Sequence, residues 1–140
     1  MEFVKFSTKV ASFNLTKGQG SDNNEDLLFV DKAGLDLATN DPSDPAHDSI
    51  EEVLLHLALC HSIVIDKRTD KMNSASPDEL ALVEGAAKQG FVFQGKDGDG
   101  VISILRKRDN QVLRYELLNT LEFDSTRKRM SVIIRDLKTN

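Results

Sequence analysis

Apolar side chains recur every three or four positions between residues 49 and 65. This is the spacing of one face of an α-helix, so the pattern predicts a helix over this range. Asp48 and Glu51 have the three-residue offset of a capping box, which places the start of the helix just before residue 49. The apolar face contains Ile50, Val53, Leu54, Leu57, Cys60, His61 and Val64.

A second helix is predicted from Pro77 to about Gln89. Ser76 is a suitable N-cap, Pro77 suits the first helical position, and Glu79 completes a second capping box. Gly90 fits the left-handed residue that often follows a helix. Taken by itself, the stretch SASPDE is therefore explained as a helix start that needs no ligand.

The polar and apolar positions after residue 90 are typical of strands. In QVLRYELL, residues 111–118, apolar and polar side chains alternate, which predicts one buried and one exposed face. The turn-forming stretches GKDGDG and DN separate neighbouring strands. The predicted strands cover residues 91–93, 101–108, 111–118, 121–123 and 130–136.

The first part of the chain gives weaker signals. Residues 2–15 predict one or two short strands, 16–26 a polar loop, and 40–48 a turn-rich connector with two prolines, while 27–37 are ambiguous. The whole chain is then a single domain with strands and loops in 1–48, two helices in 49–90 and antiparallel strands in 91–140. This order predicts the α+β class, with an antiparallel β-sheet flanked by helices.

Composition narrows the classes of function. The chain has 140 residues, a formal net charge of -5 and a single cysteine. The acidic balance disfavours a nucleic-acid partner, and one cysteine cannot form an internal disulfide. The sequence contains no run of 18 apolar residues, so we expect these residues to be soluble and not to span a membrane.

Two short motifs allow chemistry but also have simpler explanations. Phe123 is followed by three cations at 127–129, and an aromatic ring beside cations suits a nucleotide. A core phenylalanine followed by a solvated charge run is the simpler interpretation. Cys60 and His61 are adjacent on a helical pattern and point about 100° apart, so they are a poor metal pair and are expected to pack. We predict no catalytic residue and no metal ligand in this chain.

Two long segments resemble one family. SPDELALVEGAAKQGFVF, residues 76–93, and YELLNTLEFDSTRKRMSVIIR, residues 115–135, are similar to the nucleotide-binding domain of type IV P-type ATPases, the phospholipid flippases. LALCHSIV, residues 57–64, also resembles that family. The three segments follow one another in the family's order and spacing, and the resemblance covers roughly residues 50 to 136.

The resemblance implies five site residues. Glu79 falls where the family's glutamate approaches the adenine amino group, and Phe123 where its phenylalanine stacks on the adenine ring. Ser125 occupies a turn position near the sugar and phosphates, and Lys128 the ATP-facing side of the pocket. Asn119 belongs to the same motif and is assigned a supporting role.

The resemblance also implies what lies outside these residues. The family's phosphorylated aspartate, in an Asp-Lys-Thr-Gly-Thr motif, and its Lys-Gly-Ala strand do not occur in this sequence. We therefore expect an isolated, C-terminally truncated domain that binds ATP but neither hydrolyses it nor moves lipid. The parent would be an integral membrane protein with this domain in the cytosol. Its partners would be the phosphorylation and actuator domains, and Mg²⁺ would arrive with ATP without protein ligands from this chain.

Two alternatives remain at this point. The chain could be the nucleotide-binding domain of a cation-transporting P-type ATPase, which shares the EF…RKRMSV pattern more loosely. It could also be a non-enzymatic module that contacts a protein or nucleic acid through a sheet edge or its basic turn. The elements SPDE and LCH favour the lipid-transporting branch over both.

Overall fold

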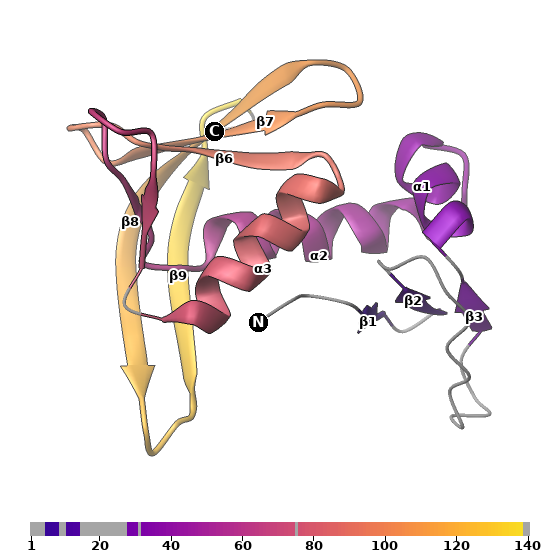
Figure 1. Cartoon of the computed structure of the whole chain (residues 1–140), viewed down its shortest axis with the longest axis horizontal. Coiled ribbons are helices and arrows are strands. Elements are labelled where there is room, and N and C mark those ends of the chain that lie inside the picture. Colours follow the sequence, from indigo (N-terminus) through magenta and orange to yellow (C-terminus); the bar gives the residue numbers. More distant parts are fainter. Residues whose placement is uncertain (1–4, 9–10, 15–27, 31, 75, 139–140) are drawn as a thin grey trace.

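The computed structural model describes residues 5–8, 11–14, 28–30, 32–74 and 76–138. Within them, a four-stranded antiparallel sheet in the order β6-β7-β8-β9 carries helices α2 and α3 on one face (Figure 1). This arrangement confirms the predicted α+β class. The elements are β1 Lys5–Ser7, β2 Ala11–Asn14, β3 Leu28–Val30, α1 Lys32–Asn40, α2 His47–Leu59, β4 Val64–Ile65, β5 Met72–Asn73, α3 Pro77–Lys88, β6 Phe91–Lys96, β7 Val101–Arg106, β8 Gln111–Asp124 and β9 Arg129–Asp136.

The start of α2 differs from the prediction. Ala46 is the N-cap and no side chain caps the helix, so the capping box of Asp48 and Glu51 is wrong. The Glu51 carboxylate instead forms ion pairs with Arg106 at 2.8 Å and Arg108 at 3.4 Å. Two arginines from the sheet side offer a carboxylate stronger partners than one backbone N–H, which explains the difference.

The end of α2 also differs, because the helix ends at Leu59 and not at residue 65. The ring of His61 turns back over the last turn, with Nε2 2.8 Å from the Ala58 carbonyl oxygen. Its Nδ1 accepts the Ile63 N–H at 3.1 Å, so Nε2 carries the proton and donates to Ala58. The ring thus pairs with backbone groups on both sides of the turn and stabilises the end of the helix at Leu59. The apolar pattern of the sequence continues beyond this point, which is why it predicts a longer helix.

Helix α3 agrees closely with its prediction. Pro77 is its first residue, and the Ser76 hydroxyl accepts the Glu79 N–H at 3.5 Å. Lys88 is the last helical residue, and Gly90 follows with φ +96. A positive φ at this position favours glycine, because it has no Cβ to clash with the backbone.

The small sheet near the N-terminus pairs β1 with β2 antiparallel and β2 with β3 parallel. β1 and β2 fall in the range 2–15 that predicts strands. Helix α1 occupies most of the ambiguous range and lies against α2 and this small sheet. The predicted loop at 16–26 lies outside the described residues.

The second half forms the main sheet; β6 extends to Lys96 beyond the predicted 91–93, β7 ends at Arg106 before the predicted residue 108, and the largest difference concerns β8. Residues 111–118 and 121–123 belong to one strand, β8, which is 14 residues long. Its pairing with β9 shifts register between Leu117 and Asn119, and again between Leu121 and Asp124. These irregularities interrupt the alternation in the sequence, which is why it predicts two strands.

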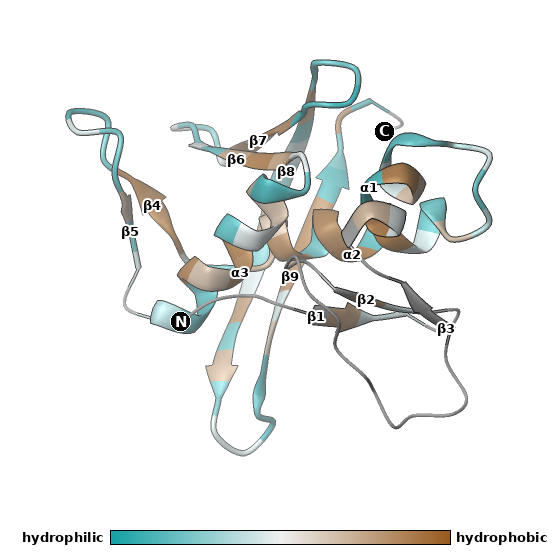
Figure 2. Cartoon of the chain, turned by 45° about the vertical axis from the view of Figure 1, so that its right-hand side comes forward, coloured by the Kyte–Doolittle hydropathy of each residue, from teal (hydrophilic) through white to brown (hydrophobic). Residues whose placement is uncertain are grey.

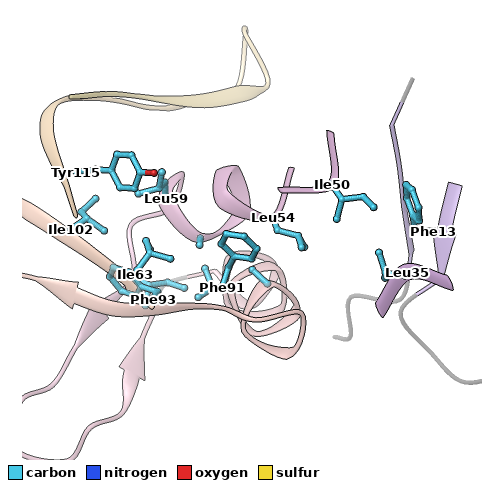
Figure 3. Packing of buried hydrophobic residues seen from close by; sticks show 14 of the residues in the cluster. Phe13, Leu35, Ile50, Leu54, Leu59, Ile63, Phe91, Phe93, Ile102 and Tyr115 are labelled. Carbon is cyan, nitrogen blue, oxygen red and sulfur yellow. The ribbon is translucent and has the colours of Figure 1, made fainter. Parts of the chain in front are cut away.

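The core runs as one body from the main sheet through α2 to the small sheet. Figure 3 shows Tyr115 and Ile102 at the sheet end, Leu54 and Ile50 along α2, and Phe13 at the far end. Leu54, Ile50 and Phe13 have no solvent exposure. Figure 2 shows the hairpin β4–β5 projecting from this body, with a hydrophilic turn. Because residues of α2, α3 and the main sheet share this core, the ends of the two helices have fixed positions relative to the sheet.

Candidate functional site

The carboxylate of Glu79 is held by two serines at the start of α3. Its Oε2 atom accepts the Ser62 hydroxyl at 2.8 Å and the Ser62 N–H at 3.3 Å. The Ser74 hydroxyl lies 3.2 Å from the same oxygen and 3.0 Å from the Ser76 carbonyl oxygen, and its single proton can be donated to one of them at a time. The Ser76 N–H donates to Ser74 Oγ at 3.0 Å and not to Glu79. Half of the predicted capping box is therefore confirmed, and the half that would occupy the carboxylate is wrong.

The other oxygen of Glu79 has no hydrogen-bond partner in the described part of the chain. A carboxylate is an acceptor, so the free Oε1 atom is available to an N–H donor. The serines restrict the rotation of the group while they occupy only one oxygen. The side chain thus combines a fixed position with an open acceptor.

Phe123 lies near the far end of β8, in the hairpin whose turn is lowest in Figure 1. It is 65% exposed, which is high for a phenylalanine and shows that it is not a core residue. Ser125 and Lys128 are exposed in the turn that follows, and Asn119 is exposed on β8 opposite Ile133. The hairpin therefore carries four of the five predicted site residues, all accessible to solvent.

The turn of this hairpin is well ordered by Asp124. The Asp124 carboxylate accepts the Thr126 N–H at 2.7 Å and the Arg127 N–H at 3.3 Å. These backbone hydrogen bonds lower the pKa of Asp124. Lys128 has φ 54, and its N–H donates to the Asp124 carbonyl oxygen at 2.6 Å. These hydrogen bonds fix the backbone at Lys128 and thereby the position of its Cβ atom.

Cys60, the C-cap of α2, lies against the β8–β9 hairpin. Its Sγ lies 3.7 Å from the carbonyl oxygen of Met130 in β9. Burial raises the pKa of this thiol first, and the nearby charge of Glu79 raises it further. Glu79 therefore lies on the side of the domain where β9 leaves the hairpin turn. The ring of His61 packs edge-on at 4.4 Å from Phe93. Both Cys60 and His61 follow the last residue of α2 and are half-buried, so the prediction that they lie on the buried face of this helix is wrong.

A cavity of about 570 Å³ opens next to this region, between the β4–β5 hairpin and strands β6 to β8. Its volume is in the range of small-molecule pockets. Ser62 lines it, as do Thr120 and Glu122 of β8, but none of the five predicted site residues does. The cavity adjoins the predicted site through Ser62, the partner of Glu79. Glu122 also lines it, but Phe123 follows Glu122 on β8 and does not line the cavity.

The role of Ser62 is not predicted by the local sequence patterns. It lies 17 positions before Glu79, between the two segments that the helix patterns emphasise. The only sequence signal was its place directly after LALCH, within the third segment that resembles the flippase family. Thr120 falls in the gap between the predicted strands 111–118 and 121–123, so only the single strand β8 shows that Thr120 and Glu122 are alternate positions.

The described residues contain no group of three or more side chains suited to hold a metal ion. Among the same residues, no helix has the length and apolar character needed to cross a bilayer.

Comparison with known proteins gives a consistent result. Residues 49–140 match the family model described as P-type ATPase, cytoplasmic domain N. The chain is 42% identical to Phospholipid-transporting ATPase DRS2 of Saccharomyces cerevisiae over 99 residues, which cover 69% of the chain and 7% of the relative. It is 37% identical to Phospholipid-transporting ATPase DNF2 of the same yeast over 79% of the chain and 7% of the relative. It is 39% identical to Phospholipid-transporting ATPase tat-1 of Caenorhabditis elegans over 81% of the chain and 10% of the relative. The chain thus spans a tenth or less of the length of these relatives.

Proposed function

Because this chain belongs to the P-type ATPases, as their cytoplasmic domain N, we propose that it binds the adenine end of ATP. The observation that carries the proposal is the Glu79 carboxylate, whose Oε2 atom contacts Ser62 and Ser74 while its Oε1 atom has no hydrogen-bond partner among the described residues. Adenine presents an amino group, which is a donor that matches this acceptor. An adenine ring also needs a flat apolar surface, and Phe123 offers one that is 65% exposed.

The phosphates extend toward the turn of the β8–β9 hairpin in this proposal. The backbone of Lys128 is fixed by its hydrogen bond to Asp124. Its ammonium group has no ion-pair partner among the described residues, so it can face a phosphate. Ser125, in the same turn, adds a hydroxyl near the sugar, and Asn119 supports the strand from which the turn begins.

We infer that the parent protein is a phospholipid-transporting ATPase and not a cation pump. The relatives at 37–42% identity carry that name, which supports this choice. In such a parent an aspartate attacks the γ-phosphate of ATP and forms an aspartyl-phosphate. Mg²⁺ would enter with ATP and be bound by the phosphorylation domain. The 140-residue chain would bind nucleotide without hydrolysing it.

A nucleotide titration tests the proposal. We expect ATP to shift the amide signals near Glu79 and Phe123 in ¹⁵N NMR spectra of the 140-residue chain, with a Kd near 1 mM, or about 4 kcal/mol. Alanine at position 123 removes the stacking surface. Because stacking of a base on an aromatic ring contributes about 1–3 kcal/mol, Phe123→Ala should weaken binding at least fivefold.

Phe91→Leu is the matched control, since Phe91 is buried in β6 and lies outside the proposed site. It should lower the free energy of unfolding and leave the Kd for ATP unchanged. Absence of saturable shifts near Glu79 and Phe123 at 10 mM ATP, in a chain that is folded by its NMR dispersion, would contradict the proposal.

A further inference from the structure

A second cavity, of about 340 Å³, lies at the opposite end of α3 from Glu79. It is bounded by the last turn of α1, the end of α3 and the end of β7. Glu79 is in the first turn of α3 and Lys88 in its last, so about 14 Å of helix separates the two regions at 1.5 Å per residue. The cavity is therefore distinct from the proposed nucleotide site.

Gln89 lines this cavity and is only 6% exposed. Both atoms of its carboxamide, Oε1 and Nε2, lack a hydrogen-bond partner in the described residues and are shielded from solvent. Buried amides are nearly always paired, so an unpaired one requires an explanation. Three torsions connect the glutamine carboxamide to the backbone, so it reaches a ligand in the cavity through a change of side-chain rotamer.

Four cationic side chains surround the same cavity, and two of them are paired with acids while the other two are not paired among the described residues. Arg106 and Arg108 are held by acids, at 2.6 Å from Asp109 and 3.4 Å from Glu51 respectively. Hydrogen bonding to Arg106 lowers the pKa of Asp109 to about 2, so this pair remains ionised near neutral pH. Lys88 and Lys107, by contrast, are exposed and form no ion pair within the described part of the chain.

The position of Lys88 has a simpler explanation, because a cation in the last turn of a helix favours the helix dipole. That explanation covers neither Lys107, which follows β7, nor the unpaired amide of Gln89. Three acids oppose the four cations: Asp36 in the wall, and Glu51 and Asp109 bound to the arginines. The cavity thus has a small positive excess, concentrated on the two lysines.

We propose that this cavity binds a small hydroxylated phosphate ester. Its phosphate group lies between Lys88 and Lys107, and its hydroxyl groups pair with the Gln89 carboxamide. A phosphate supplies only acceptors at the lysines, whereas the amide needs both a donor and an acceptor. A hydroxyl provides both, which is why the ligand carries hydroxyls beside the phosphate.

Three probes separate the parts of this ligand: glycerol 3-phosphate, inorganic phosphate and glycerol. Each is titrated into the ¹⁵N-labelled 140-residue chain at constant ionic strength, and shifts are followed at the Gln89 side-chain amide and the Gly90 and Lys107 backbone amides. We expect saturable binding of glycerol 3-phosphate. Inorganic phosphate should bind about fivefold more weakly, since one net hydrogen bond is lost, and glycerol alone should not bind.

Variants then test the named residues. Gln89→Met keeps the shape and removes an unpaired polar group, so the fold is retained while the affinity for glycerol 3-phosphate falls to that for inorganic phosphate. Lys88→Gln and Lys107→Gln should each weaken both phosphates about twofold to fivefold, as for exposed charge pairs. Lys71→Gln, in the β4–β5 turn, makes the same charge change elsewhere and should have no effect.

Two results would overturn the proposal: shifts that do not saturate by 50 mM glycerol 3-phosphate, or equal affinity for this ester in the wild type and in Gln89→Met. The source of the ligand is then distinguished with vesicles. Sedimentation with phosphatidylglycerol vesicles, but not with phosphatidylcholine vesicles, would assign the ester to a lipid headgroup if Lys88→Gln reduces it. Binding of the free ester alone would assign it to a soluble compound.

Discussion

The hydroxyl of Ser62 is the shortest contact to the Glu79 carboxylate, at 2.8 Å, so Ser62→Ala tests whether the orientation of Glu79 matters for ATP. Hydrogen bonds to charged groups contribute about 1.5–3 kcal/mol, but Ser62 is exposed and water competes for the carboxylate. We therefore take roughly 1 kcal/mol as the loss, which corresponds to about a fivefold higher Kd. The Ser62 N–H and the Ser74 hydroxyl remain as partners, so the side chain is loosened and not released.

The assay compares ATP with GTP by NMR titration. Adenine carries an amino group where guanine carries a carbonyl oxygen, which Glu79 would repel. Ser62→Ala should therefore reduce the preference for ATP over GTP as well as the affinity for ATP. Ser62→Thr retains a hydroxyl and should restore both. An unchanged Kd and an unchanged ATP-to-GTP ratio in Ser62→Ala would refute the role we assign to this anchor.

Two further predictions concern stability. Leu54→Ala should lower the free energy of unfolding by about 2–5 kcal/mol in urea denaturation, because Leu54 has no solvent exposure, whereas Leu118→Ala, at 47% exposure, should cost under about 1 kcal/mol. Similar losses in the two variants would contradict the assigned core. Burial lowers the pKa of His61 below its ordinary 6.5, so stability is complete above pH 6.5 and is lost as pH falls from 6.5 through the lower folded pKa. Urea midpoints at pH 7.5 and 5.5 should show this decrease, and a decrease of the same size in His61→Gln would contradict the assignment.

Much of the secondary structure follows from local patterns. Helix α3 begins at Pro77 after the Ser76 cap and is followed by Gly90, as its own residues predict. The strands of the second half appear where polar and apolar residues alternate. Patterns of this kind depend on neighbours within a few positions, so the sequence contains most of the information needed to predict them.

The structure differs from the local patterns mainly where a residue pairs with a partner that is distant in the sequence. Glu51 pairs with Arg106, 55 positions away, and so does not cap α2. β8 is one strand because β9 pairs with it through two irregularities. No local pattern distinguishes these outcomes from the predicted ones, because the competing partners are close only after folding.

In Glu79, the backbone follows the local sequence pattern, whereas the side chain depends on the tertiary structure. Its backbone N–H behaves as the local motif predicts and donates to Ser76. The direction of its carboxylate depends on Ser62, which the turn after α2 places beside the start of α3. A backbone group has few partners within reach, and its own segment supplies them. A charged side chain forms its strongest hydrogen bonds or ion pairs with residues that folding brings close to it. These partners are therefore determined by the tertiary structure.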